Sequence, residues 1–267
     1  MKLEVYKSVW GMTGSYEDRV ALIAEAGYDG VEGPPPGGQE GVRFRAALER
    51  HGMKYIADIV TEGDHETSFR ERLAQAAEFA PAMVNCHSAK DGMDYADLCR
   101  YFEIALAAAA ELGVVCAHET HRGRALYAPW AASDLLQTFP ELQLTADFSH
   151  WVVVTESLLE EHEPALRLAT ERAIHIHGRV GHAEGPQVSD PRAPEYAAEL
   201  AAHEGWWDTI ARSLAARGVE TLTFTPEYGP PGYLQTLPYT RQPVADLWEV
   251  CLWAAASYRK RFASLGL

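Results

Sequence analysis

The sequence predicts a single (β/α)8 TIM barrel that spans residues 1–267 as one α/β domain. Short runs rich in β-branched and aromatic residues alternate along the chain with segments of helical period. The length of 267 residues suits one large α/β domain. No low-complexity linker, charge block or shift in composition divides the chain, so we expect no second domain.

Eight strands are expected, and a segment with helical features follows each of them. The predicted strands are Leu3–Val9, Asp29–Glu32, Tyr55–Val60, Met83–His87, Val114–Glu119, Leu142–Phe148, Ala173–His177 and Thr221–Glu227. In four places a glycine lies between the end of a predicted helix and the start of the next predicted strand. Glycine readily adopts the left-handed conformation that ends a helix. These glycines are Gly27, Gly52, Gly113 and Gly218.

Polar residues and prolines mark where several helices begin. Ser15 with Asp18 has the pattern of an N-cap. Thr67 or Ser68 is expected to open the helix that ends near residue 79, and Thr155 to cap a later one. Proline loses no hydrogen bond in the first turn of a helix, and three prolines lie at or near further helix starts: Pro129, Pro194 and Pro243.

An open, doubly wound parallel sheet is the competing fold. Such a sheet normally shows a glycine-rich phosphate loop after an early strand. The chain contains neither the G-x-G-x-x-G pattern nor a Walker sequence. Because eight strand–helix units in one domain are typical of a closed barrel, the barrel is the fold we predict.

The charge balance argues against some classes of partner. Lysine and arginine number 23 against 38 aspartates and glutamates, which gives a formal net charge of −15. Binding to nucleic acid or to an anionic membrane depends on basic surfaces, so neither partner is expected. The longest apolar stretch, residues 104–110, is far shorter than the ~18 residues that a membrane span requires. With no secretory signal and no C-x-x-C pair, a cytoplasmic protein with free thiols is expected.

Four potential metal ligands stand at the predicted ends of strands five to eight: Glu119, Asp147, His177 and Glu227. Reactive groups of a barrel lie at this end of the strands. Alternate residues of a strand point to the same face, so the residues two and four positions before each of these ligands should also point into the barrel. Most of them are small or β-branched, which suits the narrow interior of the barrel. Three carboxylates that converge in a buried space repel one another unless a cation neutralises them. Three oxygen ligands and one imidazole suit one divalent ion, either Mn²⁺, Co²⁺, Mg²⁺ or Zn²⁺.

Other residues near these strand ends are candidates for the substrate pocket, and each has a structural alternative. His175 lies two residues before His177 on the same predicted strand, so both side chains are expected to point into the barrel, and His175 could be the ligand instead. Arg179 either neutralises an oxyanion or carboxylate of the substrate or pairs with a neighbouring acid. His87 and Trp10, at the ends of the fourth and first strands, either line the pocket or have a structural role in the core.

The sequence resembles the xylose-isomerase-like barrel superfamily of sugar isomerases and epimerases, which includes tagatose/psicose epimerases and a keto-inositol dehydratase. The resemblance covers essentially the whole chain. It rests on Gly27-Tyr28-Asp29-Gly30-Val31-Glu32, which is similar to the family's second-strand motif, and on the four strand-end residues. In that family a Glu, an Asp, a His and a second Glu bind one divalent ion. The resemblance therefore implies this role for Glu119, Asp147, His177 and Glu227.

The same resemblance bears on the residues around these ligands. His150, three residues after Asp147, matches a family histidine that touches the substrate. The chain departs from the family pattern after His177, where a glycine and Arg179 stand in place of a frequent Lys-Asp or similar polar pair. The choice between His175 and His177 as the ligand therefore stays open.

The resemblance implies a divalent-metal-dependent sugar isomerase or epimerase. Glu119 and Glu227 would transfer a proton next to a ketone through an enediolate. The same constellation could instead serve a keto-polyol or keto-sugar dehydratase, which is a lyase, or a non-catalytic sugar-binding barrel. The expected partner is a small-molecule sugar or keto-polyol. The apolar last helix, with Trp248 and Trp253, either packs on the barrel or serves a homo-oligomer.

Overall fold

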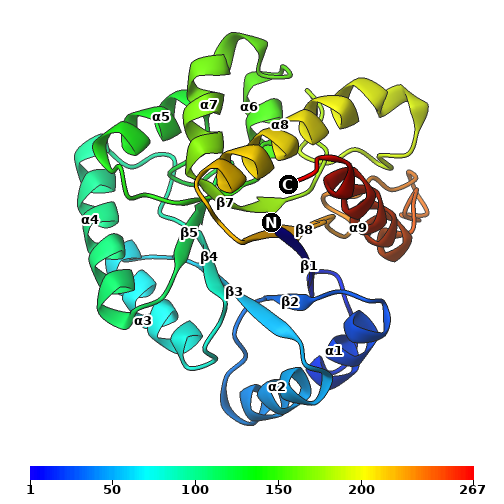
Figure 1. Cartoon of the computed structure of the whole chain (residues 1–267), viewed down its shortest axis with the longest axis horizontal. Coiled ribbons are helices and arrows are strands. Elements are labelled where there is room, and N and C mark those ends of the chain that lie inside the picture. The colour runs from blue at the N-terminus through cyan, green and yellow to red at the C-terminus, as the bar shows by residue number, and fades with distance from the viewer.

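The computed structural model of the chain describes all 267 residues. Eight parallel strands close into one barrel in the order β1 to β8, which confirms the predicted TIM barrel (Figure 1). The strands are β1 (Lys2–Ser8), β2 (Gly30–Gly33), β3 (Lys54–Val60), β4 (Met83–His87), β5 (Cys116–Glu119), β6 (Leu144–Ala146), β7 (Ala173–His177) and β8 (Thr221–Thr225). The helices are α1 (Tyr16–Glu25), α2 (Gly38–His51), α3 (His65–Ala77), α4 (Tyr95–Leu112), α5 (Pro129–Thr138), α6 (Ser149–Thr155), α7 (Glu163–Arg172), α8 (Ala197–Ala216) and α9 (Leu247–Ser264), with the 3₁₀ helices η1 (Glu160–His162) and η2 (Pro194–Tyr196).

Backbone pairing between the first and last strands closes the barrel. β1 pairs with β2 on one side and with β8 on the other, so the sheet has no free edge. Side chains alternate along each strand, and Tyr6 on β1 points into the barrel, where it packs with Ile56, Met83 and Ala117. A larger apolar cluster lies between the strands and the surrounding helices. The helices therefore cover the outer face of the sheet on all sides (Figure 1).

Local sequence signals explain several helix ends. Ser15 caps α1 in a reciprocal capping box with Asp18, as predicted. Gly52 and Gly113 follow α2 and α4 with φ angles of 62° and 64°, a conformation that glycine adopts at little steric cost. Pro129 is the first residue of α5, where its missing N–H leaves no bond unmade.

Two predicted helix starts are wrong. α3 begins before Thr67 and Ser68, because the N-cap is Asp64, whose carboxylate accepts a hydrogen bond from Thr67 N. Thr155 ends α6 and does not open the next helix. Its hydroxyl donates to the carbonyl of Trp151 one turn earlier, as a threonine in the last turn of a helix can do.

Two strands that carry site acids end earlier than predicted. β6 ends at Ala146 and β8 at Thr225, so Asp147 and Glu227 stand on the loops just beyond the paired residues. Pro226 follows β8 and has no N–H to donate to a neighbouring strand. The other strand bounds differ from the prediction by two residues at most.

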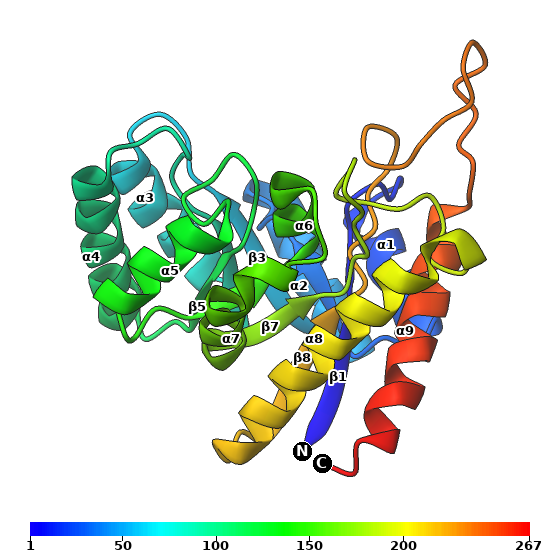
Figure 2. The same ribbon diagram turned by 90° about the horizontal axis from the view of Figure 1, so that it is seen from above.

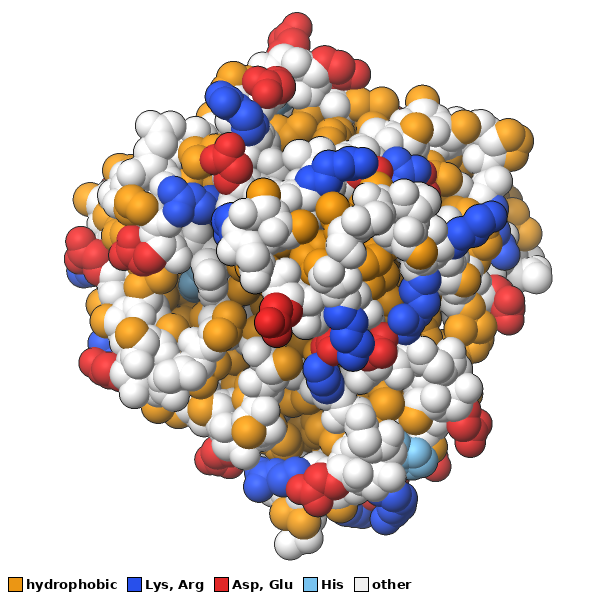
Figure 3. Space-filling view, in the orientation of Figure 1, with side chains coloured by type: hydrophobic (Ala, Val, Ile, Leu, Met, Phe, Trp, Pro, Cys, Tyr) orange, Lys and Arg blue, Asp and Glu red, His pale blue; other side chains and the backbone are white.

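The two ends of the barrel carry different features. The loops that follow the strands lie at one end, and both chain termini lie at the other (Figure 2). The loop of residues 226–246, between β8 and α9, projects beyond the rest of the molecule (Figure 2). On the face drawn in Figure 3, basic and acidic side chains are interspersed and form no continuous basic patch. No helix combines the length and the apolar character needed to cross a bilayer.

The packing of Phe224 requires a glycine at position 178. A Cβ atom on Gly178 would lie 1.9 Å from Phe224 Cζ, and the Phe224 ring is buried and stacked on Tyr258. We expect Gly178→Ala to lower the free energy of unfolding by about 1–3 kcal/mol, as overpacking does, and urea denaturation measures this. Gly205→Ala is the matched control, because a Cβ at this position in α8 meets nothing within 4 Å. It should raise stability by up to about 1 kcal/mol. Wild-type stability of the Gly178→Ala protein would show that the ring moves aside freely.

Candidate active site

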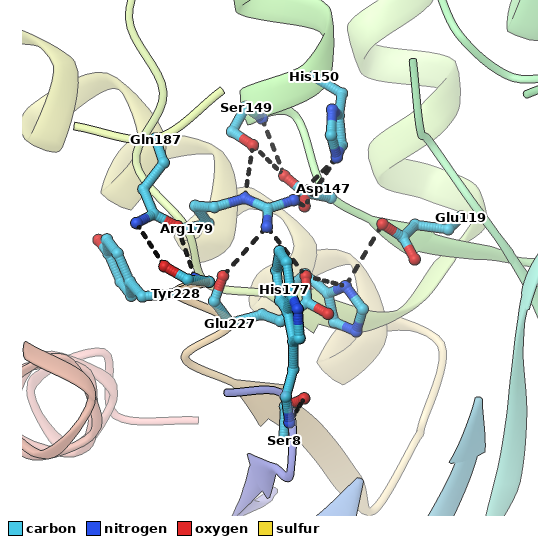
Figure 4. A network of polar contacts seen from close by, with 12 residues as sticks. Ser8, Glu119, Asp147, Ser149, His150, His177, Arg179, Gln187, Glu227 and Tyr228 are labelled. Carbon is cyan, nitrogen blue, oxygen red and sulfur yellow. Dashed lines mark hydrogen bonds and ion pairs between the residues drawn. The ribbon is translucent and has the colours of Figure 1, made fainter. Parts of the chain in front are cut away.

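Four side chains from the second half of the barrel meet where the strands end. Glu119 ends β5 and His177 ends β7, while Asp147 and Glu227 follow β6 and β8. One donor atom from each of the four lies within 4.8 Å of the others. All four side chains are buried, and they point toward one another (Figure 4). The structure thus brings together the four residues that the sequence proposed as ligands.

Glu119 is anchored through only one of its two oxygens. Asn85 Nδ2 donates to Oε2 at 2.9 Å, and His87 Nε2 lies 2.6 Å from the same oxygen. Oε1 is buried and has no hydrogen-bond partner. Burial by itself raises the pKa of Glu119, but His87 and His177 outweigh this effect and hold the pKa well below its usual value. Glu119 therefore presents an ionised, unpaired oxygen to the site.

The orientation of His177 is fixed by Glu32, a buried residue of β2. His177 Nε2 donates to Glu32 Oε1 at 2.8 Å, because a carboxylate can only accept. The other ring nitrogen, Nδ1, lies 3.3 Å from Glu227 Oε2 and 3.6 Å from Glu119 Oε1 and has no hydrogen-bond partner. Burial by itself lowers the pKa of His177, but the carboxylates of Glu227, Glu32 and Glu119 outweigh this effect and raise the pKa well above its usual value. Nδ1 therefore faces the acids and can bind a cation once it gives up its proton.

His175 occupies a different position, deeper in the barrel. Its Nε2 lies 3.4 Å from Glu32 Oε2, and its Nδ1 lies 2.8 Å from the hydroxyl of Thr223. His175 is therefore adjacent to the group that orients His177 and outside the cluster of four. Of the two histidines that the sequence left open, the structure places His177 with the acids.

Asp147 is held by the turn that begins α6. Its Oδ1 accepts hydrogen bonds from the backbone N–H of Ser149, at 3.1 Å, and from the Ser149 hydroxyl. Its own N–H and carbonyl both bond the hydroxyl of Thr120, at 2.8 Å and 2.9 Å. Burial raises the pKa of Asp147 to about 6, although Arg179 opposes the rise. The carboxylate cannot turn away from the site without breaking its two bonds to Ser149.

Arg179 supplies positive charge to the site, and its side chain is 1% exposed. It forms ion pairs with Asp147 Oδ2 and, at 3.2 Å, with Glu227 Oε2 (Figure 4). Its Nη2 also donates to His150 Nε2 at 2.8 Å, so that ring nitrogen carries no proton. Burial lowers the pKa of His150 well below its usual value, which agrees with a neutral ring. Arg179 therefore pairs with neighbouring acids, one of the two roles that the sequence allowed.

A cavity of about 480 Å³ opens beside the cluster, a size that suits a small molecule. Its walls include Trp10, His87, His121, Arg179, Glu227 and Tyr233. The rings of Trp10 and Tyr233 meet edge to face with their centroids 4.9 Å apart. His87 and Trp10 therefore line the cavity, whereas His150 lies behind Arg179 and His175 lies below the cluster.

The donor set fits one divalent ion. Glu119 Oε1 and His177 Nδ1 are buried, lack hydrogen-bond partners and lie 3.6 Å apart, and such orphaned polar atoms are costly unless a ligand satisfies them. Carboxylate oxygens and an imidazole nitrogen are ligands that Mn²⁺, Co²⁺, Mg²⁺ or Zn²⁺ accept. The three negative charges of Glu119, Asp147 and Glu227 would be balanced by the two charges of the ion and the single charge of Arg179.

Residues 20–243 match the family described as "Xylose isomerase-like TIM barrel". The chain belongs to this family. The matched region contains all four clustered residues, and it confirms the resemblance found in the sequence. A comparison with curated protein sequences gives no match.

Several solved structures share the xylose isomerase-like fold. A xylose isomerase-like TIM barrel protein from Mycobacterium smegmatis, in complex with magnesium, superposes with a TM-score of 0.66 at 11% identity, over 98% of this chain and 97% of that one. A D-tagatose 3-epimerase-like protein has a TM-score of 0.62 at 12% identity, over 100% and 98%. The probable 3-DHS dehydratase AsbF from Bacillus anthracis has a TM-score of 0.60 at 16% identity, over 86% and 94%. At these identities the similarity shows the fold alone.

Three contacts that support the site of this xylose isomerase-like barrel, made by Asn85, Glu32 and Tyr233, were not predicted from the sequence. Asn85 precedes His87 by two residues on β4, so the alternation of the strand could have found it. Glu32 contacts His177 from across the barrel, and Tyr233 reaches Trp10 from the long loop after β8. These contacts join segments that are far apart in the chain, so no local sequence pattern predicts them.

Arg179→Met would leave the carboxylates of Asp147 and Glu227 buried without a counter-charge. At pH 8 the wild-type Asp147, with its pKa of about 6, is ionised and paired with Arg179. We expect the metal-free variant to lose about 3–5 kcal/mol of unfolding free energy at this pH, as when one partner of a buried pair is removed. Urea denaturation in EDTA measures the loss. Arg192→Met breaks an exposed pair with Asp190 and should cost less than about 1 kcal/mol. Equal losses in the two variants would contradict this role of Arg179.

Proposed function

We propose that this xylose isomerase-like barrel is a divalent-metal-dependent sugar isomerase or epimerase. The observation that supports this most is the convergence of Glu119 and Glu227 with Asp147 and His177 beside a cavity of about 480 Å³. Two carboxylates at one site can remove a proton from a bound molecule and return it. The proposed substrate is a sugar or keto-polyol with a ketone next to a hydroxyl-bearing carbon.

The metal ligands would be Glu119, Asp147, His177 and Glu227. A divalent ion in this position supplies Lewis acidity, which polarises a carbonyl oxygen. The protein holds these ligands from outside: Glu32 orients His177, and Ser149 with Thr120 fixes Asp147. Such outer contacts set the direction of the ligand atoms, as in other metal sites.

Glu119 and Glu227 would carry the proton. Asn85 and His87 both contact Oε2 of Glu119 and so fix the orientation of its carboxylate. Glu227 is 7% exposed and forms part of the cavity wall. Return of the proton to the opposite face of the same carbon gives an epimer, and return to the adjacent carbon interconverts an aldose and a ketose.

The remaining predicted residues would orient the substrate, two directly and two through a neighbour. Trp10 lines the cavity and offers a flat face to the C–H groups of a sugar, while His87 lines it close to Glu119. His150 would act by holding the guanidinium of Arg179. His175 would act through Glu32, which both histidines of β7 contact.

Two loops would exclude water from the reacting carbon. The loop after β7 and the loop after β8 are joined by a pair of hydrogen bonds between Gln187 and Gly229, at 2.7 Å and 3.1 Å. Val180 N also donates to the hydroxyl of Tyr228 at 3.3 Å. The two loops are therefore tied to each other beside Arg179 and would move as one unit (Figure 4).

The reaction class can be tested with a panel of ketoses and keto-polyols in D₂O. We expect the protein loaded with Mn²⁺ to incorporate deuterium at the carbon next to the ketone of at least one compound. An epimer, an aldose or a dehydrated ketone as product would distinguish the epimerase, isomerase and dehydratase. Absence of both exchange and product, with every metal and compound, would contradict an enzymatic role and favour a sugar-binding barrel.

Glu227→Gln removes the proton-carrying oxygen and keeps the volume of the side chain. We expect kcat to fall by at least about 100-fold while the circular dichroism spectrum is unchanged, because acid–base catalysis contributes on this scale. The assay is the rate of deuterium incorporation. Glu141→Gln, at an exposed position, serves as the control and should retain the wild-type rate. Near-normal turnover of the Glu227→Gln protein would exclude this assignment.

Glu32→Gln tests the outer contact of His177. The amide can no longer hold the Nε2–H of His177 with a charged acceptor, so Nδ1 loses its fixed direction and basicity. We expect the affinity for Mn²⁺, measured by isothermal titration calorimetry, to fall about 10–100-fold. Glu49→Gln, on the exposed face of α2, should bind Mn²⁺ like the wild type. Unchanged affinity in Glu32→Gln would remove Glu32 from this role.

A further inference from the structure

A second cavity, of about 450 Å³, lies next to the active site. Its walls come from the loop after β1, from α1, from the start of α9 and from the long loop between β8 and α9. In Figure 1, α1 and α9 lie near β1 on the outside of the barrel. Trp10, Gly11 and Met12 line both cavities, so the loop after β1 is a common wall.

Lys7 is a buried cation in this second cavity. On β1, Tyr6 points into the barrel, so the alternation of the strand turns Lys7 outward into the helix layer. Lys7 is 2% exposed and lines the cavity. Its ammonium donates one hydrogen bond, at 2.6 Å to the carbonyl of Ser8, and forms no ion pair. The ring centroid of Trp248 lies 5.9 Å from Nζ.

A lysine this deeply buried is normally paired with an acid. An ammonium group has three N–H donors, and only one of the three on Lys7 has a hydrogen-bond acceptor in the protein. Removing such a charge from water without a counter-ion is costly. The arrangement therefore lacks an anion that would take the remaining donors, and the cavity beside Lys7 offers room for one.

The rest of the cavity wall is mostly apolar. It includes Leu22, Leu234, Leu247 and Trp248, with prolines from the loop after β8. The one acid in the wall is Asp246, whose carboxylate accepts the N–H of Glu249 as the N-cap of α9. An acid in the wall also repels a second negative charge on a ligand. A monoanion with an apolar body matches this combination of groups.

We propose that this cavity binds a small carboxylate with an apolar chain or ring, and that Lys7 is the residue that binds the carboxylate. The carboxylate accepts from the Lys7 ammonium, and the apolar body packs on Leu247 and Trp248. The site is separate from the cluster of Glu119 and Glu227, and it does not depend on the proposed reaction.

Hexanoate is the probe, and hexanamide is its neutral counterpart of nearly the same shape. Binding of each is measured by ligand-observed NMR and calorimetry with wild type and with Lys7→Met, whose unbranched side chain is one atom shorter and carries no charge. We expect wild type to prefer hexanoate, and Lys7→Met to lose at least about tenfold in hexanoate affinity, as when a charged hydrogen bond is removed. Its affinity for hexanamide should stay the same.

Two further variants keep the test decisive. Lys7→Arg preserves the charge and should retain the preference for hexanoate, and urea denaturation verifies that each variant is folded. Arg19→Met removes a cation that lines the active-site cavity and should leave hexanoate binding unchanged. The proposal is overturned if wild type does not prefer hexanoate to hexanamide, if folded Lys7→Met binds hexanoate like the wild type, or if Arg19→Met alone abolishes binding.

Discussion

The concentration of negative charge at one end of the barrel is the constraint on which the rest of the site depends. Glu119, Asp147 and Glu227 are buried within a single cluster, and Glu32 lies just below them. Carboxylates lose their hydration on burial, and their mutual repulsion is weakly screened there. Burial and the nearby Glu32 raise the pKa of Asp58 well above its usual value, so the same electrostatic cost acts on this further acid.

Each carboxylate of the cluster has its own compensation. Asp147 and Glu227 share the guanidinium of Arg179, while Glu119 lies against His87. Glu32 takes the Nε2–H of His177, which leaves Nδ1 facing the acids. These contacts leave two atoms without a hydrogen-bond partner at the centre, Oε1 of Glu119 and Nδ1 of His177. The structure is therefore charge-balanced at its edges and incomplete at its centre, which is the arrangement that a divalent ion would complete.

Much of the fold and part of the site could be predicted from the sequence. The barrel and the positions of Glu119 and His177 at strand ends follow from local alternation and from the order of strands and helices. The capping box of Ser15 was likewise predictable, because it depends on residues within one turn. The ends of the strands were harder to predict, because the pairing of a strand stops where its neighbour stops, as at Ala146 on the three-residue β6.

The remaining features depend on contacts between distant segments. The side chains of His175 and His177 point to the same face of β7. Their different roles follow from the position of Glu32 on β2, which both histidines contact. The sequence allowed two partners for Arg179, and the choice depends on where Asp147 and Glu227 lie after the barrel closes. Sequence spacing defines the direction of a side chain, whereas the packing of the whole barrel decides what it meets.

The central claim, that these four side chains hold one divalent ion, is tested most directly by anomalous diffraction at the manganese absorption edge from a crystal grown with Mn²⁺. The predicted result is a single strong peak bounded by Glu119, Asp147, His177 and Glu227, with Glu119 Oε1 and His177 Nδ1 among its ligands. A map with no peak between these residues, or with its main peak elsewhere in the molecule, would contradict the claim.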